Sequence, residues 1–214
     1  LGLAAESDNG LLIVGASPWT CALAQVLKKL EIDVLLVDGV YHSLKAARMQ
    51  GIEVYYGEIL SEHAEQALKT HHLNHLLCTT DNDFYNALVC RAEGRDFGRH
   101  RTFQIATHHE SRQESKRLTL QQRGHIAFDS SAGFETLHQR LDEGWTVQST
   151  SLREGFDFGQ LKGRLGELGR DWLLLGGITP VGEFRLYSHE QRFRLESGWT
   201  ALYFAPEHKS KADA

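Results

Sequence analysis

Short apolar runs alternate with segments of helical spacing from residue 11 to residue 141, and this alternation restricts the fold more than any other feature. The runs are bounded by glycine or polar residues, which is typical of parallel strands buried on both faces. Strands are expected at residues 11–14, 34–37, 53–56, 76–79, 102–106 and 126–128, and helices at 18–30, 43–50, 61–69, 83–93, 110–123 and 134–141. Right-handed crossovers place such helices on both faces of one sheet. We therefore predict an α/β fold, a Rossmann-like doubly wound parallel sheet.

The pattern changes after Gly144, where regular alternation with helices ends. Four further strands are expected at residues 145–152, 172–178, 183–187 and 199–204, with one short helix at 158–168. These segments predict a small β-rich C-terminal appendix. The expected organisation is a nucleotide-binding domain at 9–143, a β-rich subdomain at 144–206 and a flexible polar tail at 207–214.

The turn after the first strand indicates a binding site for phosphate. A dinucleotide-binding turn has the pattern G-x-G-x-x-G, and here Gly15 matches the first glycine, while Ser17 and Thr20 replace the other two. Ser17 and Pro18 are favourable residues for starting a helix, whose N-terminus attracts anions. Asp38 follows about twenty residues on, where an acid bonds ribose hydroxyls. The alternative is a degenerate turn that binds nothing.

Three blocks of the sequence together resemble a known family. Residues 12–38 contain the first turn and the strand-two acid, residues 51–58 read GIEVYYGE, and residues 79–86 read TTDNDFYN. In this order they resemble the TrkA-N domains, also called RCK domains (regulators of potassium conductance). The resemblance covers roughly residues 11–142. The β-rich remainder is most similar to the tail of a bacterial sodium/proton antiporter that carries such a domain.

The resemblance implies a binding site for an adenine nucleotide (AMP, ADP or ATP) or NAD(H). Its first turn would face phosphate, Asp38 would hold the ribose, Glu58 would lie near the nucleotide, and the residues after strand four would line the adenosine. The candidate site residues are Gly15, Ala16, Ser17, Pro18, Trp19, Asp38, Gly57, Glu58, Thr79, Thr80 and Asp81. The two replaced glycines favour a mononucleotide over NAD. Thr107-His108 stands where many members carry an arginine, so no phosphate clamp is expected there.

Composition limits the partners of the chain. A net charge of -5 argues against nucleic acid, and the apolar runs are too short to cross a bilayer. The three cysteines form no C-x-x-C pair and are expected to be reduced core thiols. His71, His72 and His75 are interpreted as a solvated cluster rather than a metal site. Asp83 is expected to cap the following helix.

These observations predict a regulatory module that is not an enzyme. No nucleophile stands in a recognisable catalytic setting. The chain starts at Leu1 and its single methionine is Met49, so a fragment of a longer protein is expected. The family resemblance implies a soluble, homodimeric domain at the cytoplasmic face of the inner membrane, where ligand binding gates an attached cation/proton antiporter or potassium transporter. The alternatives are an NAD(P)-dependent oxidoreductase and a nucleotide-free dimerisation scaffold.

Overall fold

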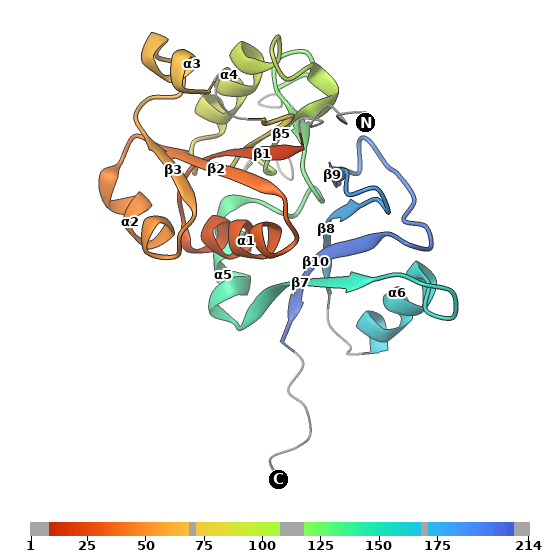
Figure 1. Ribbon diagram of the computed structural model, residues 1–214. Coiled ribbons are helices and arrows are strands. Elements are labelled where there is room, and N and C mark those ends of the chain that lie inside the picture. The colour runs from red at the N-terminus through yellow and green to blue at the C-terminus, as the bar shows by residue number, and fades with distance from the viewer. Residues whose placement is uncertain (1–8, 69–71, 108–117, 168–170, 208–214) are drawn as a thin grey trace, which may run out of the picture.

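A six-stranded parallel sheet forms the larger part of the molecule (Figure 1). The computed structural model describes residues 9–68, 72–107, 118–167 and 171–207. The strands are β1 (Gly10–Val14), β2 (Asp33–Asp38), β3 (Glu53–Tyr56), β4 (His75–Cys78), β5 (Thr102–Gln104) and β6 (His125–Ile126). Their order is β3-β2-β1-β4-β5-β6, and each neighbouring pair runs parallel. This is the strand order of a doubly wound sheet, so the predicted fold class is confirmed.

Helices cover both faces of this sheet. On one face lie α1 (Pro18–Lys29), α2 (Tyr41–Met49) and α5 (Phe134–Asp142), and on the other lie α3 (Glu62–Leu68) and α4 (Asp83–Glu93) (Figure 1). A short 3-10 helix, η1 (Arg99–Arg101), precedes β5. Because side chains alternate along a strand, Leu11 and Ile13 of β1 pack in the core beside α1, whereas Leu12 and Val14 pack in the core beside α4.

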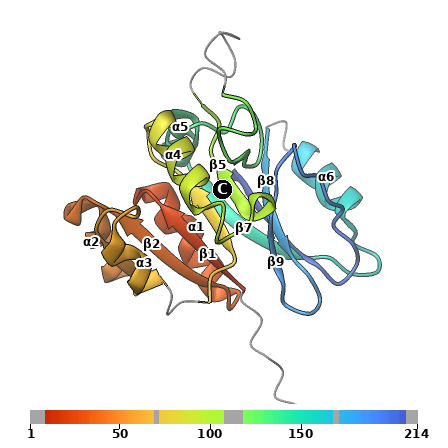
Figure 2. The ribbon, with the colours of Figure 1, turned by 90° about the horizontal axis from the view of Figure 1, so that it is seen from above.

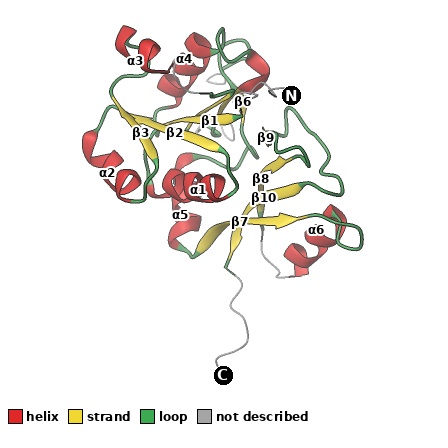
Figure 3. Cartoon of the chain, in the orientation of Figure 1, coloured by secondary structure: helices red, strands yellow, loops and turns green. Residues whose placement is uncertain are grey.

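A second, antiparallel sheet follows and gives the chain its β-rich C-terminal appendix (Figures 2 and 3). Its strands are β7 (Trp145–Ser151), β8 (Leu173–Ile178), β9 (Phe184–Leu186) and β10 (Thr200–Pro206), in the order β7-β10-β8-β9. The helix α6 (Phe158–Glu167) packs on one face of this sheet through Leu161 and Leu165. The other face points toward α1.

The two sheets share one hydrophobic core, with α1 between them. The Trp19 ring of α1 lies 5.8 Å from the ring of Phe128, which follows β6, and 6.3 Å from that of Phe204 in β10. Leu11 of β1 and Leu175 of β8 belong to the same buried cluster. The second sheet is thus held against the first by apolar packing. The domain boundary at residue 144 stays a prediction.

Three sequence-based expectations need correction. The helix expected at 110–123 is absent from the described residues 118–123, where the backbone N–H of Gln122 bonds the carbonyl of Thr119 in a turn; residues 108–117 lie outside the described part. The cap of α4 is Asn82 rather than Asp83, because the Asn82 side chain accepts a hydrogen bond from the Tyr85 N–H. His75 is buried inside β4 instead of solvated.

Several other expected features involve residues outside the described part. These are His71 in the histidine cluster, His108 after β5, and residues 208–214 of the expected tail. The cysteine expectation is confirmed, since Cys21, Cys78 and Cys90 are all free and buried.

Candidate functional site

The first βα turn is built around a glycine that no other residue could easily replace. Gly15 has a φ of 109°, which L side chains rarely adopt. A Cβ at this position would lie 2.9 Å from the Thr79 Oγ1 and 3.0 Å from the Thr80 backbone nitrogen. The backbone of the first turn therefore lies directly against the segment that follows β4. This close approach brings together two of the segments predicted to contact a nucleotide.

A capping box closes the start of α1. The Ser17 Oγ accepts a hydrogen bond from the Thr20 N–H at 3.2 Å, and the Thr20 Oγ1 accepts one from the Ser17 N–H at 2.8 Å. Pro18 has no N–H to offer. Two donors of the helix start are thus satisfied by the chain itself. A phosphate bound here would have to compete with the hydroxyls of Ser17 and Thr20.

Asp38 joins the first turn to the end of β2. Its Oδ2 accepts a hydrogen bond from the Ala16 N–H and its Oδ1 accepts one from the Val40 N–H, both at 2.7 Å. The carboxylate is half-buried at the carboxyl ends of β1 and β2. Ligands of open α/β sheets bind at this edge. The predicted ribose acid and the predicted phosphate turn are therefore in direct contact.

Glu58 lies in the loop after β3 and is paired with a residue that the sequence analysis did not single out. The Tyr85 hydroxyl donates a hydrogen bond to the Glu58 Oε1 at 2.5 Å. Burial raises the pKa of Tyr85, and the Glu58 hydrogen bond and charge raise it further. The Gly57 N–H donates to the Asp38 carbonyl at 3.1 Å. Glu58 and Gly57 thus border the same crevice as Asp38.

The three residues after β4 differ in their burial and in their hydrogen-bond partners. Thr79 is buried and its hydroxyl donates to the carbonyls of Val14 and Gly15, so its side chain stabilises the first turn and does not face the crevice. Thr80 is bonded to Asn86, whose Oδ1 accepts from both the N–H and the hydroxyl of Thr80. Asp81 is exposed to solvent. Asp81 and the outward part of Thr80 are the portions of this segment that a ligand could reach.

Trp19 is the predicted site residue whose side chain the structure places elsewhere. It is 1% exposed, and its ring lies in the core between the two sheets. Its backbone is at the start of α1, but its indole cannot contact a ligand in the crevice without unpacking the core. The helical spacing of α1 could have indicated this, because Trp19 is four residues before Leu23, which is also buried.

Two exposed tyrosines beside Asp38 were also not predicted. Tyr41 begins α2 and Tyr56 ends β3, where it lies opposite Asp38 in the sheet register. Their rings meet edge to face with centroids 5.5 Å apart, although both side chains are more than half exposed. Large exposed aromatic groups are common where a flat ligand binds. In the sequence analysis Tyr56 was only the last residue of a predicted strand, and Tyr41 lay between a predicted strand and a predicted helix.

The described residues contain neither a group of metal ligands nor a membrane-spanning helix. Within them, no group of three or more His, Cys, Asp or Glu side chains is arranged to hold a metal ion. The helices of this part of the chain are also too short or too polar to cross a bilayer. The polar groups at the crevice are instead hydroxyls, amides and carboxylates, which suit hydrogen bonding to a polar organic ligand.

The chain is similar to known proteins in sequence and in structure. The family model described as TrkA-N domain matches residues 11–122, just over half of the 214 residues. Similar solved structures include "GsuK channel bound to NAD" (18% identity, TM-score 0.46), "GsuK Channel" (18%, 0.47) and "Crystal Structure of the GsuK RCK domain" (13%, 0.44). Each comparison covers 96% of this chain but 37%, 37% and 46% of those chains, respectively. No curated protein matches the chain.

Proposed function

Because this chain belongs to the TrkA-N domain family, we propose that it is a regulatory domain that binds a nucleotide in the crevice between the Gly15 turn, Asp38 and Glu58. The observation that carries the proposal is the contact between the Asp38 carboxylate and the Ala16 N–H. This contact supports the proposal because it holds a carboxylate, which can accept hydrogen bonds from ribose hydroxyls, beside a helix N-terminus at the carboxyl edge of a parallel sheet. In a nucleotide the ribose and the first phosphate are directly bonded, so the carboxylate that binds the ribose and the helix N-terminus that binds the phosphate must lie close together.

The capping box favours a mononucleotide over a dinucleotide. In the dinucleotide-binding pattern the second glycine lets a pyrophosphate approach the backbone, whereas here the Ser17 side chain occupies that place and bonds the Thr20 N–H. AMP, ADP or ATP can place a terminal phosphate at the edge of such a turn. In NAD(H) the pyrophosphate joins two nucleosides, so it would have to lie across the turn that the Ser17 side chain occupies. We therefore propose an adenine mononucleotide as the preferred ligand and NAD(H) as the weaker one.

The exposed tyrosine pair supports an adenine base beside the ribose acid. Tyr56 pairs with Asp38 across the β2–β3 register, and Tyr41 follows Val40, whose N–H bonds the Asp38 carboxylate. A base attached to a ribose held by Asp38 would reach one of these two rings. Stacking on an aromatic ring contributes about 1–3 kcal/mol per base. In this arrangement Tyr41 and Tyr56 select for an aromatic base.

We further propose that the ligand acts on a membrane transport protein of which this chain is the regulatory part. The partner would be a cation/proton antiporter or a potassium transporter at the cytoplasmic face of the inner membrane. Ligand binding shifts a conformational equilibrium only if the ligand prefers one state, so the nucleotide-bound and free domains must differ at the surface that contacts the partner. The domain is proposed to act as a homodimer.

Titration calorimetry with AMP, ADP, ATP, NAD and NADH tests the proposed site. We expect binding of at least one adenine mononucleotide to wild type and a loss of at least tenfold in affinity for Asp38→Ala, since the variant lacks the ribose acceptor. Asp33→Ala is the matched control, because Asp33 is an exposed aspartate at the other end of the same strand. Equal affinities of wild type and Asp38→Ala would contradict the proposed site.

A nucleotide-free scaffold is the second candidate, and one observation favours it. The N–H groups of Ala16, Ser17 and Thr20 all bond side chains of the chain itself, so the turn is satisfied without a ligand. The same titration separates the two candidates. If none of the five compounds binds wild type while the protein is folded and dimeric, the scaffold function stands and the regulatory site is excluded.

A further inference from the structure

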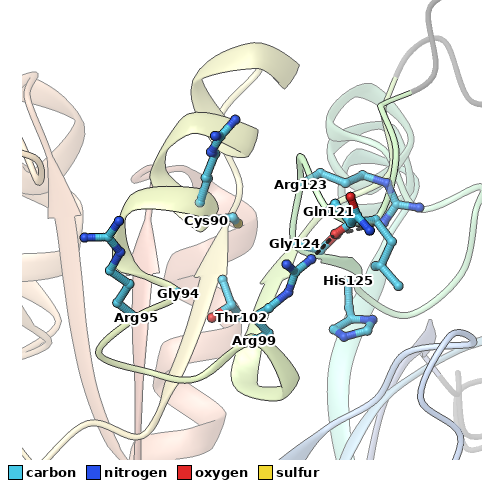
Figure 4. A pocket seen from close by; sticks show the side chains of 11 residues that line it. Cys90, Gly94, Arg95, Arg99, Thr102, Gln121, Arg123, Gly124 and His125 are labelled. Carbon is cyan, nitrogen blue, oxygen red and sulfur yellow. Dashed lines mark hydrogen bonds between the residues drawn. The ribbon is translucent and has the colours of Figure 1, made fainter.

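An arginine-lined pocket lies at the edge of the parallel sheet opposite to the nucleotide crevice. Its volume is about 220 Å³, and its lining comes from the C-terminal end of α4, from η1, from the start of β5 and from the segment that leads into β6 (Figure 4). The side chains that carry the argument are Arg91, Arg95, Arg99, Arg123 and His125. Since β5 and β6 start here, the pocket is at the amino ends of the strands, and the Asp38 crevice is at their carboxyl ends.

The charge of this pocket is opposite to that of the whole chain. The chain has a net charge of -5, yet four arginines and no aspartate or glutamate line the pocket. One carboxylate pairs with the cluster from outside: Glu190 accepts two hydrogen bonds from Arg123, at 2.6 and 3.1 Å. The lining residues themselves therefore carry a net positive charge, although Glu93 and Asp96 belong to the same segment of the chain. A concave, locally cationic surface on an acidic protein attracts anions.

Two of the guanidinium groups are held in place by other elements. The side chain of Arg123 is 10% exposed, and besides Glu190 it bonds the Gly124 carbonyl at 2.7 Å. Arg99 donates from Nη2 to the Leu120 carbonyl at 2.6 Å. Figure 4 shows Arg99 reaching toward the segment that carries Gln121 and Arg123. A guanidinium has five N–H donors, so these contacts leave Arg99 able to bind an anion.

The other two arginines, Arg91 in the last turn of α4 and Arg95 just after this helix, are exposed. Arg91 and Arg95 form no hydrogen bond or ion pair within the described part of the chain, and Arg95 points away from Arg99 (Figure 4). An exposed side chain without a partner can turn toward a bound anion at the cost of its rotamer freedom alone. The pocket thus combines two arginines that are held in place by hydrogen bonds with two exposed arginines that can turn toward a bound anion.

Stabilisation of α4 does not explain this arrangement. A basic residue in the last turn of a helix interacts favourably with the helix dipole, and Arg91 is in that position. Arg99 and Arg123 belong to other elements and line the same pocket. Burial lowers the pKa of His125, with the charges of Arg123 and Arg99 acting in the same direction against Glu190.

We propose that this pocket binds a compact phosphate-bearing anion with at least two negative charges. The guanidinium group matches phosphate oxygens in geometry and charge. The volume is below the range typical of pockets for drug-sized ligands, so a phosphate or diphosphate group fits better than a whole nucleotide. Two sources supply such a group, a free phosphate compound or the headgroup of an anionic lipid. The site is separate from the nucleotide crevice.

Calorimetric titration with inorganic pyrophosphate at low ionic strength tests the free source. We expect pyrophosphate to bind wild type, and Arg99→Gln and the double variant Arg91→Gln/Arg95→Gln each to lose roughly tenfold in affinity, as for one charge-assisted hydrogen bond. Arg164→Gln is the control, because Arg164 is an exposed arginine on α6, remote from the pocket. Asp38→Ala should bind pyrophosphate like wild type, which separates this site from the proposed nucleotide site.

Sedimentation with phosphatidylcholine vesicles that do or do not contain phosphatidic acid tests the lipid source. Binding that requires phosphatidic acid and is lost in Arg99→Gln, without pyrophosphate binding, assigns the pocket to a lipid headgroup. Pyrophosphate binding that is lost in the same variant assigns it to a free phosphate. Because Arg91 and Arg95 are exposed and form no hydrogen bond or ion pair with the residues that the structure describes, their double variant guards against a folding artefact. Wild-type affinity in both arginine variants, or no binding in either assay, would overturn the proposal.

Discussion

Gly15 shows how a single residue sets the geometry of the candidate site. Its positive φ and its contact with Thr79 and Thr80 leave no room for a side chain. We expect Gly15→Ala to lower the free energy of unfolding by about 1–3 kcal/mol, since a strained left-handed residue and a steric contact add up. Urea denaturation measures this loss.

A second glycine serves as a control, because its replacement by alanine is expected to stabilise the protein. Gly163 lies within α6, and a Cβ there would meet nothing within 4 Å. Gly163→Ala should therefore stabilise the protein by about 0.5–1 kcal/mol, because alanine loses less backbone freedom in a helix. If both substitutions have the same effect, the backbone geometry assigned to the first turn is wrong.

His75 makes stability depend on pH. Burial, followed by the charges of Arg101, His100 and Arg185, lowers its pKa from 6.5 to about 3. The unfolded chain binds a proton below pH 6.5 that the folded chain takes up only near pH 3. Stability from this residue is thus fully present above pH 6.5 and is lost as the pH falls toward 3. The slope approaches about 1.4 kcal/mol per pH unit.

Replacement of His75 by Phe tests this dependence. The buried ring already stacks on Phe103 at 6.2 Å, so an aromatic ring without a titrating group fits the chemistry of the site. Between pH 6 and 4, in about the range where a normal histidine gains its proton, we expect thermal melting of His75→Phe to change less than that of wild type. The exposed His42→Gln is the control. Equal pH dependence of all three proteins would show that His75 is not the group responsible.

At the scale of elements, the hydrophobic pattern located almost every helix and strand of the described chain, but it did not determine their ends. The N-cap of α4 was placed one residue late, because Asn82 and Asp83 are both favourable capping residues and the choice depends on backbone conformation. The helix expected at 110–123 does not extend over residues 118–123, where the Thr119–Gln122 turn and the bond from Arg99 to Leu120 hold the chain. Long-range contacts of this kind leave no periodic signal.

The outer face of α4 offers a surface on which the proposed homodimer can be tested. Phe84 and Leu88 are 67% and 54% exposed and lie one helical turn apart. If this face pairs with a second copy, Phe84→Glu/Leu88→Glu should shift the protein from dimer to monomer, because like charges would replace apolar contact. Light scattering coupled to size exclusion measures the mass. Met49→Glu on α2, which is 80% exposed, is the control. A dimer that survives the double substitution would exclude this face.

At the scale of the whole molecule, the sequence indicated two sheets but not their common core. The candidate crevice followed from the order of strands, because the carboxyl ends of parallel strands meet at one edge. The burial of Trp19 could not be foreseen in the same way. Its partners Phe128 and Phe204 are far away in the sequence, and periodicity shows which face is buried without showing against what.

The common core predicts that both sheets unfold together. Wild type should give coincident urea transitions by far-ultraviolet circular dichroism and by tryptophan fluorescence, which also reports on Trp145 and Trp199 near the second sheet. Trp19→Ala should reduce the free energy of unfolding by about 3–5 kcal/mol. Val181→Ala, at an 88% exposed position, should change it by less than about 0.5 kcal/mol. Two separate transitions in wild type would contradict a shared core.

The position of Trp19 also couples the candidate crevice to the C-terminal sheet. It is the second residue of α1, so two peptide bonds separate the Ser17 cap from a ring lodged against β10. Since packed cores resist gradual deformation, a phosphate that displaces the Ser17–Thr20 pair and shifts the start of α1 must also move this ring. Ligand binding in the crevice would then move the antiparallel sheet through the Trp19 side chain, without a hinge between the two sheets. The antiparallel sheet would be the surface by which the domain signals to a partner that the crevice is occupied.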